Sequence, residues 1–497
     1  MKSSTCFCRL VIAMVQLWAN KKGKSTVLLG LLWLALVVPH ISARYSYNWD
    51  SSQYARGVEH FDIARHQPHP PGYPLWILAL KGTTRLTGNA SSGQVVLALL
   101  FTLAALPFFH SLAREMLGER AGLAATALLA FSPLVLTHAM VPVNYAVDLF
   151  VSCAAAWFAA GMWRGDARHA VAAFAVVAAA AGFRQSGATF LLALLGAALW
   201  RSCRNRPVRA AAALAAGAAV WLAWYLPTAR MSGGITALSR MTSTQASLSI
   251  AKTSILFGAP PAMHGVMVVA VCIGFALALG ALAAPAAAAL LGRRKGPRAA
   301  LPCWATPMFF ALWLAPNLAM VFLLHYGAAG YILLSLPPLV LVGAWLCGPV
   351  LENGKWVAAA VAASLALSYL PYERFIGGTP SGRVAYQFLR ASPRFAWLVE
   401  DSQRELRTLI DAMDGRPDER LIYCLLERPE APNLRTVTYH YAAVNWAGFG
   451  RTPGAGIRTI GWLCDGAGLP ADIRARYPNA RRAGGNALYS FFTAPAY

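Results

Sequence analysis

Long apolar runs separated by short polar segments cover the first three quarters of the chain. A helix that spans a membrane needs about 20 mostly apolar residues. From residue 371 onward the apolar runs stop, and charged residues, Pro and Gly become as frequent as in a water-soluble domain. The pattern therefore predicts an all-α polytopic module at 1–371 and a separate domain at 372–497. The module is expected to hold about eleven transmembrane helices, at 26–43, 93–113, 121–137, 146–163, 169–183, 187–200, 210–228, 263–291, 303–324, 331–349 and 356–370.

Composition supports a membrane protein and excludes two other classes. Hydrophobic residues make up 57% of the chain and charged residues only 13%, which excludes a purely cytosolic enzyme. The net charge of +23 could suggest nucleic-acid binding, but the basic residues stand in short clusters between apolar runs, not in one polar domain. We therefore expect membrane lipids as partners and no nucleic acid.

The distribution of Lys and Arg predicts which side of the membrane each loop faces. With the N-terminus inside, the inner segments hold 18 basic residues and the outer segments of the membrane module hold nine. Basic residues are enriched in cytoplasmic loops, so the N-terminus is expected in the cytoplasm. An odd number of spans then places 372–497 outside a bacterial inner or plasma membrane. A second interpretation of the first apolar run stays open, because basic residues before Val27 and the small residues at 41–43 also resemble a cleavable signal peptide.

The C-terminal domain is expected to be a small extracytoplasmic α/β or α+β domain. A charged, helical stretch near 400–413 precedes a strand-like run at 420–426. Cys424 and Cys464 are the two outward-facing cysteines, and this compartment permits a disulfide between them without requiring one.

Candidate chemistry concentrates in the outer loops of the membrane module. The carboxylates there are Asp50, Glu59 and Asp62 in the first external loop, at about 44–92, and Asp148 at the outer start of a span. The loop is rich in aromatic residues and Pro, and it is too long to be a simple connector. Its most distinctive string is His69-Pro70-Pro71-Gly72-Tyr73-Pro74-Leu75, which follows the pair Trp49-Asp50.

These strings resemble the first external loop of the GT-C superfamily. Its members are polytopic glycosyltransferases that use polyprenyl-phosphate sugars, and they include protein O-mannosyltransferases and lipid A aminoarabinose transferases. The likeness covers about 45–345 and is strongest for the branch related to protein O-mannosyltransferases. Weaker similarities follow in order along the chain, at Ser132-Pro133, Asn144-Tyr145 with Asp148, 182–187, 224–227 with 232–234, and 325–331 with Pro337.

The resemblance implies that Asp50 is the catalytic base that takes a proton from the attacking acceptor. The alternative is a helix cap, since Asp50-Ser51-Ser52-Gln53 fits an N-cap with Gln at the third helical position. Asp148 is expected to be a helper acid that orients the acceptor, or else a carboxylate that stabilises a helix N-terminus. Arg184 is expected to neutralise the departing phosphate, or else to snorkel to lipid headgroups.

Further substrate-binding candidates surround these three residues. His66, His69 and Tyr73 lie in the first-loop string and are expected to shape the loop or to bind the acceptor or phosphate. Arg240 and Lys252, in the polar segment 229–262, are alternative phosphate ligands, and that segment is expected to order when the donor binds. His325 and Tyr331 flank an outer turn, where they line the site or simply pack. The imidazoles match no strong metal motif, so no metal and no cofactor are expected.

Three functions remain to be weighed. The first is an inverting glycosyltransferase that moves a sugar from a polyprenyl-phosphate donor to a glycan, lipid or protein acceptor on the outer face. The second is a transporter or flippase of a lipid-linked or anionic solute, which would place its essential ionisable residues near the middle of spans. The third is a non-catalytic membrane scaffold. The position of the candidate residues in outer loops and at outer helix ends favours the glycosyltransferase.

Overall fold

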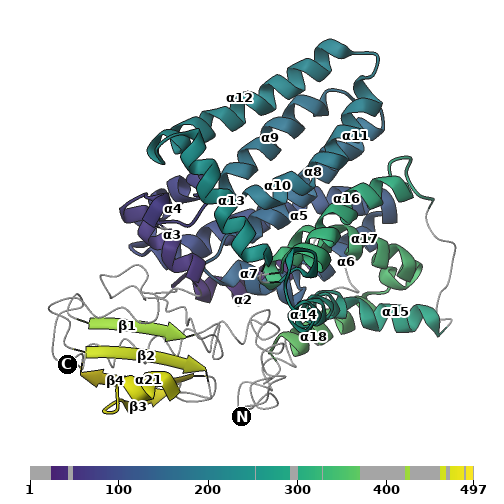
Figure 1. Ribbon diagram of the computed structural model, residues 1–497. Coiled ribbons are helices and arrows are strands. Elements are labelled where there is room, and N and C mark those ends of the chain that lie inside the picture. The colour runs from purple at the N-terminus through teal and green to yellow at the C-terminus, as the bar shows by residue number, and fades with distance from the viewer. Residues whose placement is uncertain are drawn as a thin grey trace.

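A computed structural model describes residues 24–42, 49–65, 67–251, 253–291, 300–326, 328–369, 420–425, 459–465, 469, 471–485 and 489–495. Most of these residues form helices, which pack together as one body (Figure 1). The α-helices are α2 (Lys24–Val37), α3 (Trp49–Glu59), α4 (Pro74–Thr87), α5 (Ala90–Leu117), α6 (Glu119–Ala130), α7 (Pro133–Met140), α8 (Ala146–Trp163), α9 (His169–Phe183), α10 (Gln185–Phe190), α11 (Leu192–Cys203), α12 (Pro207–Met231), α13 (Ile235–Ala251), α14 (Pro261–Leu279), α15 (Ala283–Leu290), α16 (Pro307–Ala319), α17 (Leu336–Cys347), α18 (Gly354–Tyr369) and α21 (Ala471–Arg476).

Shorter helical turns connect several of these helices. Turns of 3-10 helix lie at Val38–Ser42, Ile63–Arg65, Ile255–Phe257, Gly280–Leu282, Ala329–Leu334 and Gly348–Glu352, and a π-helical turn at Met320–Leu324. Local sequence explains many of the helix starts. Proline occupies the first turn of α4, α7, α12, α14, α16 and α17, where its missing N–H costs no hydrogen bond.

Five helical segments within the described residues are long and apolar enough to cross a membrane. They are Ala90–Leu117, Ala146–Trp163, Pro207–Met231, Pro261–Leu290 and Pro307–Leu324. A sixth span is formed if α6 and α7 count as one, although they meet at an angle of 55°. Shorter apolar helices lie at Gly30–Ile41, His169–Phe183, Leu192–Cys203 and Leu336–Glu352.

The difference from the expected eleven spans has a physical cause. The expected span 121–137 is broken, because Pro133 starts a new helix after Ser132. The apolar helices His169–Phe183, Leu192–Cys203 and Leu336–Glu352 lie at other expected spans but are shorter than a full span. The polytopic all-α class is confirmed, whereas the count of eleven remains a prediction.

Small polar side chains join helices that are distant in sequence. Ser152 on α8 donates to the carbonyl of Leu334 at 2.6 Å and accepts from the indole of Trp313 on α16 at 2.9 Å. Ser364 on α18 donates to the carbonyl of Phe131 at 2.6 Å. Because no water competes in an apolar interior, such bonds fix how neighbouring helices are aligned.

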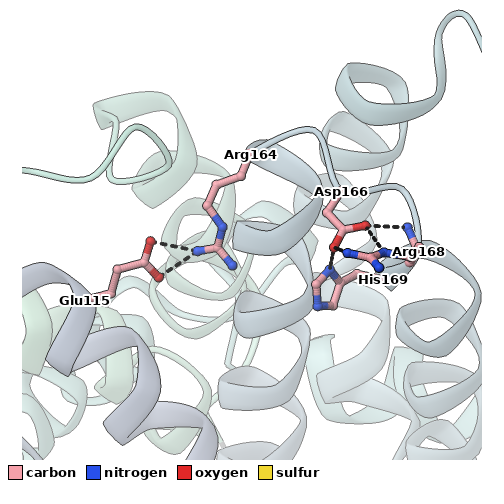
Figure 2. Close-up of polar contacts among 5 residues, drawn as sticks. All are labelled: Glu115, Arg164, Asp166, Arg168 and His169. Atoms are coloured by element: carbon pink, nitrogen blue, oxygen red, sulfur yellow. Dashed lines mark hydrogen bonds and ion pairs between the residues drawn. The ribbon is translucent and has the colours of Figure 1, made fainter.

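At the end of the bundle where α8 leads into α9, acidic and basic side chains pair with each other. Figure 2 shows Arg164 directed at Glu115 on α5, with its Nη1 2.6 Å from Oε2, and Arg168 bonded through Nε to Asp166 at 3.0 Å. Hydrogen bonds from Arg168 lower the pKa of Asp166 to about 2. Asp166 is therefore ionised at any physiological pH and neutralises Arg168.

The C-terminal segments form a four-stranded mixed sheet. Its strands are β1 (Arg420–Leu425), β2 (Thr459–Asp465), β3 (Arg481–Gly485) and β4 (Tyr489–Pro495), in the order β1-β2-β4-β3 (Figure 1). β1 and β2 run parallel, and the other neighbours are antiparallel. In this register Cys464 lies opposite Leu425 and not opposite Cys424. The predicted domain boundary at 371/372 lies outside the described residues.

Candidate functional site

The loop before α4, which the sequence predicts to be external, forms a short helix, α3, and a Pro-rich return that lies against it. Asp50 stands in the first turn of α3, and its side chain is 26% exposed. The amide Nε2 of Gln94 on α5 donates to the carbonyl of Ser51 at 3.0 Å. This bond attaches the start of α3 to a long apolar helix, and it thereby fixes the position of Asp50.

His69 connects the Pro-rich return to α3 through Gln53. The oxygen Oε1 of Gln53 accepts from the backbone N–H of His69 at 3.2 Å and lies 2.6 Å from Nδ1 of the ring. An amide oxygen can only accept, so Nδ1 carries a proton. In neutral His69 the other nitrogen, Nε2, then accepts from the hydroxyl of Tyr73, 3.0 Å away. Gln53 therefore holds His69 instead of closing a capping box at the start of α3.

The backbone before α4 takes a conformation that directs Tyr73 into this network. Gly72 has φ 102°, and a Cβ at this position would collide with the side chain of Ile63. Tyr73 has φ 47°, the left-handed conformation that residues with side chains rarely adopt. Such a strained residue persists only when its surroundings hold it, and here Pro74 starts α4 while the ring of Tyr54 packs edge-on at 5.3 Å.

A buried ion pair forms the second half of the site. Nε of Arg184 donates to Oδ2 of Asp148 at 2.6 Å, and each side chain is only 3% exposed. Asp148 lies in the first turn of α8, and Arg184 lies between α9 and α10. This burial excludes the alternative in which Arg184 snorkels to lipid headgroups.

Polar and aromatic groups complete the environment of Arg184. Its Nη1 donates to Oδ1 of Asn144 at 2.9 Å, and Nδ2 of Asn144 donates in turn to the carbonyl of Phe183 at 3.2 Å. The guanidinium carbon lies 3.9 Å from the ring centre of Tyr145 and 5.2 Å from that of Tyr331. These contacts fix the plane of the guanidinium and stabilise its charge.

Electrostatics join the two halves into one cluster. Burial raises the pKa of the Tyr54 and Tyr73 phenols above their usual range, Asp50 raises both further, and Arg184 lowers both. The same two charged groups also act on Tyr331. The packing agrees, because the side chain of Leu75, two residues after Tyr73, lies against Gly182, two residues before Arg184. Asp50 and Arg184 therefore lie on one tyrosine-lined cluster, and its phenols stay protonated at neutral pH.

The structure brings together six of the ten predicted site residues and connects a seventh. The six are Asp50, His69, Tyr73, Asp148, Arg184 and Tyr331. His325 packs edge-on against Tyr331 at 5.7 Å, and its Nδ1 lies 3.2 Å from the hydroxyl of Thr253. Arg240 is exposed on α13 and makes no ion pair among the described residues. His66 and Lys252 lie outside the described residues.

Sequence reasoning missed several members of the cluster. Tyr54 is four residues after Asp50 on α3, a spacing that places both on one helix face and could have identified it. Its buried hydroxyl has no hydrogen-bond partner among the described residues. Asn144 and Tyr145 stood in a recognised string without an assigned role, and nothing local to Gln94 indicated its contact with Ser51.

Metal binding was considered for the histidines of the first loop. Within the ranges that the structure describes, no group of three His, Cys, Asp or Glu side chains is arranged to hold a metal ion. His69 is engaged by Gln53 and Tyr73 through both ring nitrogens.

The ion pair depends on a glycine beneath it, which leads to a testable prediction. A Cβ on Gly187 of α10 would collide with Oδ1 of Asp148, whereas a Cβ on Gly196 of α11 meets nothing within 4 Å. We expect Gly187→Ala to displace Asp148 and to destabilise the protein by about 1–3 kcal/mol. Gly196→Ala should instead stabilise it slightly, since Ala favours a helix interior. Unfolding of both variants in detergent tests this, and equal stability would contradict it.

Comparisons with known proteins agree on the fold. Residues 68–230 match the family described as dolichyl-phosphate-mannose-protein mannosyltransferase. No curated protein gives a significant sequence match. The crystal structure of ArnT from Cupriavidus metallidurans bound to undecaprenyl phosphate is similar, with a TM-score of 0.56 and 14% identity over 94% of this chain and 97% of that chain. The apo state of the same protein has a TM-score of 0.52, with the same identity and coverage.

The family match begins at Pro68, so it includes the His-Pro-Pro-Gly-Tyr-Pro-Leu string together with Asp148 and Arg184. The structural likeness extends along nearly the whole of both chains and shows a shared fold. The fold, the family match and the apolar helices lead to one classification: the chain is a multi-pass membrane protein that shares the fold of ArnT, and its residues 68–230 are similar to the dolichyl-phosphate-mannose-protein mannosyltransferase family.

Proposed function

We propose that the protein transfers a sugar from a polyprenyl-phosphate donor to an acceptor at the outer face of the membrane, with inversion at the anomeric carbon. The observation that supports this best is the presence of a partly exposed carboxylate, Asp50, and a buried guanidinium, Arg184, on one tyrosine-lined cluster. The shared fold with ArnT, which has been solved with undecaprenyl phosphate, supports the class of donor.

Asp50 acts as the general base in this proposal. Of the two carboxylates in the cluster, Asp148 is already engaged by Arg184, whereas Asp50 forms no ion pair with a Lys or Arg among the described residues, and its Oδ1 lies 3.9 Å from Nδ1 of the His69 ring. Asp50 can therefore take the proton from an acceptor hydroxyl as its oxygen attacks the anomeric carbon. The bond from the sugar to the phosphate breaks in the same displacement, and the polyprenyl phosphate leaves with the electron pair.

Arg184 stabilises the negative charge that develops on the leaving phosphate. A guanidinium has five N–H groups, and the contacts to Asp148 and Asn144 use one on Nε and one on Nη1. The remaining N–H groups can donate to phosphate oxygens. Because its plane is held in advance, Arg184 does not have to reorganise as the charge develops, which is the condition for effective electrostatic catalysis.

Asp148 serves as a positioning residue, since it acts through Arg184 and not on the acceptor as the sequence led us to expect. Its contact to Nε, together with that of Asn144 to Nη1, fixes the orientation of the guanidinium. Its second oxygen, Oδ1, has no hydrogen-bond partner among the described residues. Neither of these two contacts uses Nη2, so the N–H groups that Asp148, Asn144 and the nearby Tyr331 hydroxyl leave unused can donate to the phosphate.

The aromatic residues bind and orient the substrate in the proposed site. Tyr73 donates to His69 and so presents its oxygen as an acceptor for a substrate hydroxyl, whereas Tyr54 still has a hydroxyl proton to donate. Tyr331 lies beside the Arg184 guanidinium, and His325 packs against the ring of Tyr331. Arg240, Lys252 and His66 remain proposed ligands of the donor.

The direct test incubates the purified protein with polyprenyl-phosphate sugars and an acceptor and measures the released polyprenyl phosphate. Release that depends on acceptor would support the transferase. Solute flux in vesicles without any glycosyl transfer would favour the transporter. Testing hexosyl and pentosyl donors against glycan, lipid and protein acceptors would identify both substrates.

The proposed orientation places the N-terminus in the cytoplasm and the cluster outside, and cysteine labelling tests it. Ser243 on α13 and Asn205 in the turn between α11 and α12 are both exposed. In a variant without native cysteines, we expect Ser243→Cys to react with a membrane-impermeant thiol reagent in intact cells. Asn205→Cys should react only after the cells are opened. The reverse pattern would place Asp50 in the cytoplasm.

A further inference from the structure

The turn between α11 and α12 carries a concentrated positive charge. Arg204, Arg206 and Arg209 are exposed there, and Arg201 lies one helical turn earlier. The chain contains no Asp or Glu from residue 167 to residue 351. No ion pair to these four arginines occurs within the described ranges. The charge of this turn is therefore not neutralised by the part of the protein that the structure describes.

The neighbouring turn between α8 and α9 is different. Nε of Arg201 donates to the carbonyl of Trp163 at 3.1 Å, so the end of α11 lies beside the end of α8. In the α8–α9 turn, however, Arg164 pairs with Glu115 and Arg168 with Asp166 (Figure 2). Two adjacent turns thus lie at one end of the bundle. The arginines of the α8–α9 turn pair with carboxylates of the protein, whereas those of the α11–α12 turn have no carboxylate partner among the described residues.

The start of α12 adds to the positive charge of the α11–α12 turn. Arg206 precedes the helix without a side-chain capping bond, Arg209 lies in its first turn, and no acidic residue is present there. The N-terminus of a helix already bears a partial positive charge. Arginines at this position repel that charge, so the arrangement is unfavourable unless an anion compensates.

Apolar side chains beside the arginines indicate where this turn lies. Trp200 is 74% exposed and Val208 is 80% exposed, on either side of Arg204 and Arg206. α12 is one of the helices that can cross a membrane. Exposed Trp next to the end of a spanning helix is typical of the boundary between headgroups and hydrocarbon.

We propose that the α11–α12 turn, Arg201–Arg209, binds the headgroups of anionic phospholipids in the leaflet on its side of the membrane. Its arginines contact the phosphate groups, and Trp200 and Val208 pack against the upper part of the acyl chains. Charge complementarity favours an anionic lipid as the bound molecule. Each basic residue beside a spanning helix contributes about 1 kcal/mol of attraction to an anionic membrane surface. The interaction is separate from the catalytic cluster and does not rest on the proposed reaction.

Native mass spectrometry of the purified full chain in detergent tests this proposal. The protein is titrated with phosphatidylglycerol and, separately, with phosphatidylcholine, and the dissociation constant of the first bound lipid is compared. We expect the wild type to prefer phosphatidylglycerol, and the triple variant R204Q/R206Q/R209Q to lose about tenfold or more of its affinity for that lipid. Thermal unfolding should change little, because the three side chains are exposed.

Two control variants separate charge from other effects. R204K/R206K/R209K keeps the charge and should keep most of the preference. E115Q/R164Q removes the neighbouring ion pair without changing the net charge and should bind as the wild type does. The proposal is overturned if the wild type does not distinguish the two lipids, if the glutamine variant binds phosphatidylglycerol normally, or if either control loses as much affinity as that variant.

Discussion

Asp50→Asn should lower the rate of sugar transfer by about 10²-fold or more, the range expected when a general base is removed. Asparagine keeps the shape of the side chain but cannot take the proton of the acceptor hydroxyl. The fold should survive, because Gln94 holds the start of α3 through the backbone carbonyl of Ser51 and not through the Asp50 carboxylate. The measurement is release of polyprenyl phosphate by purified protein at saturating donor and acceptor.

Glu59→Gln provides a matched control for this variant. Glu59 is an exposed carboxylate at the opposite end of the same helix, so its loss removes an equal charge without touching the cluster. Its rate should stay near that of the wild type. If Asp50→Asn also turns over at nearly the wild-type rate, Asp50 supports the start of α3 and is not the base.

Arg184→Gln is expected to reduce stability strongly as well as activity. The substitution leaves the Asp148 carboxylate buried without its cation, and breaking a buried pair from one side costs about 3–5 kcal/mol. The free energy of unfolding can be followed in mixed micelles titrated with a denaturing detergent. Arg240→Gln, at an exposed position on α13, is the control and should change stability by less than about 1 kcal/mol.

A double variant separates the structural role of Arg184 from its catalytic role. Asp148→Asn with Arg184→Gln removes both charges, so it should recover more than half of the stability lost by Arg184→Gln. Transfer should not recover, because the phosphate still lacks its guanidinium. In the double variant the single-turnover rate constant should fall more than the affinity for the donor, since the contact between Arg184 and the phosphate strengthens as negative charge develops on the phosphate. A stable double variant with a normal single-turnover rate would show that Arg184 is only structural.

The membrane class and the position of the site were predictable because they depend on local patterns. Apolar runs identify helices that enter a bilayer, and the string from His69 to Leu75 carried the resemblance to the GT-C superfamily, in line with the family match that begins at Pro68. The number of spans was less predictable, because the break at Ser132 and the short lengths of helices such as α9 and α11 depend on how neighbouring helices pack. A run of apolar letters does not reveal whether it forms one straight helix or two bent ones.

Within the site, the residue types were predictable but their partners were not. Arg184 and Asp148 were both chosen as candidates, yet nothing in the sequence showed that they bind each other, because they stand 36 positions apart on different helices. The same limitation applies to His69, whose contacts with Gln53 and Tyr73 determine which ring nitrogen carries the proton. Pairing of this kind depends on tertiary distance, and spacing along a chain reports distance only within a single helix or strand.

The sequence by itself determined that this protein enters a membrane and which charged residues are candidates for its site. Composition, hydrophobic runs and short motifs are local properties, so they can be read without a fold. Only the tertiary structure decided that Asp148 neutralises Arg184 while Asp50 stays partly exposed, and that Arg164 and Arg168 have carboxylate partners whereas the arginines of the next turn have none among the described residues. Charge and burial decide what an ionisable group can do, and both are set by residues that meet only when the chain folds.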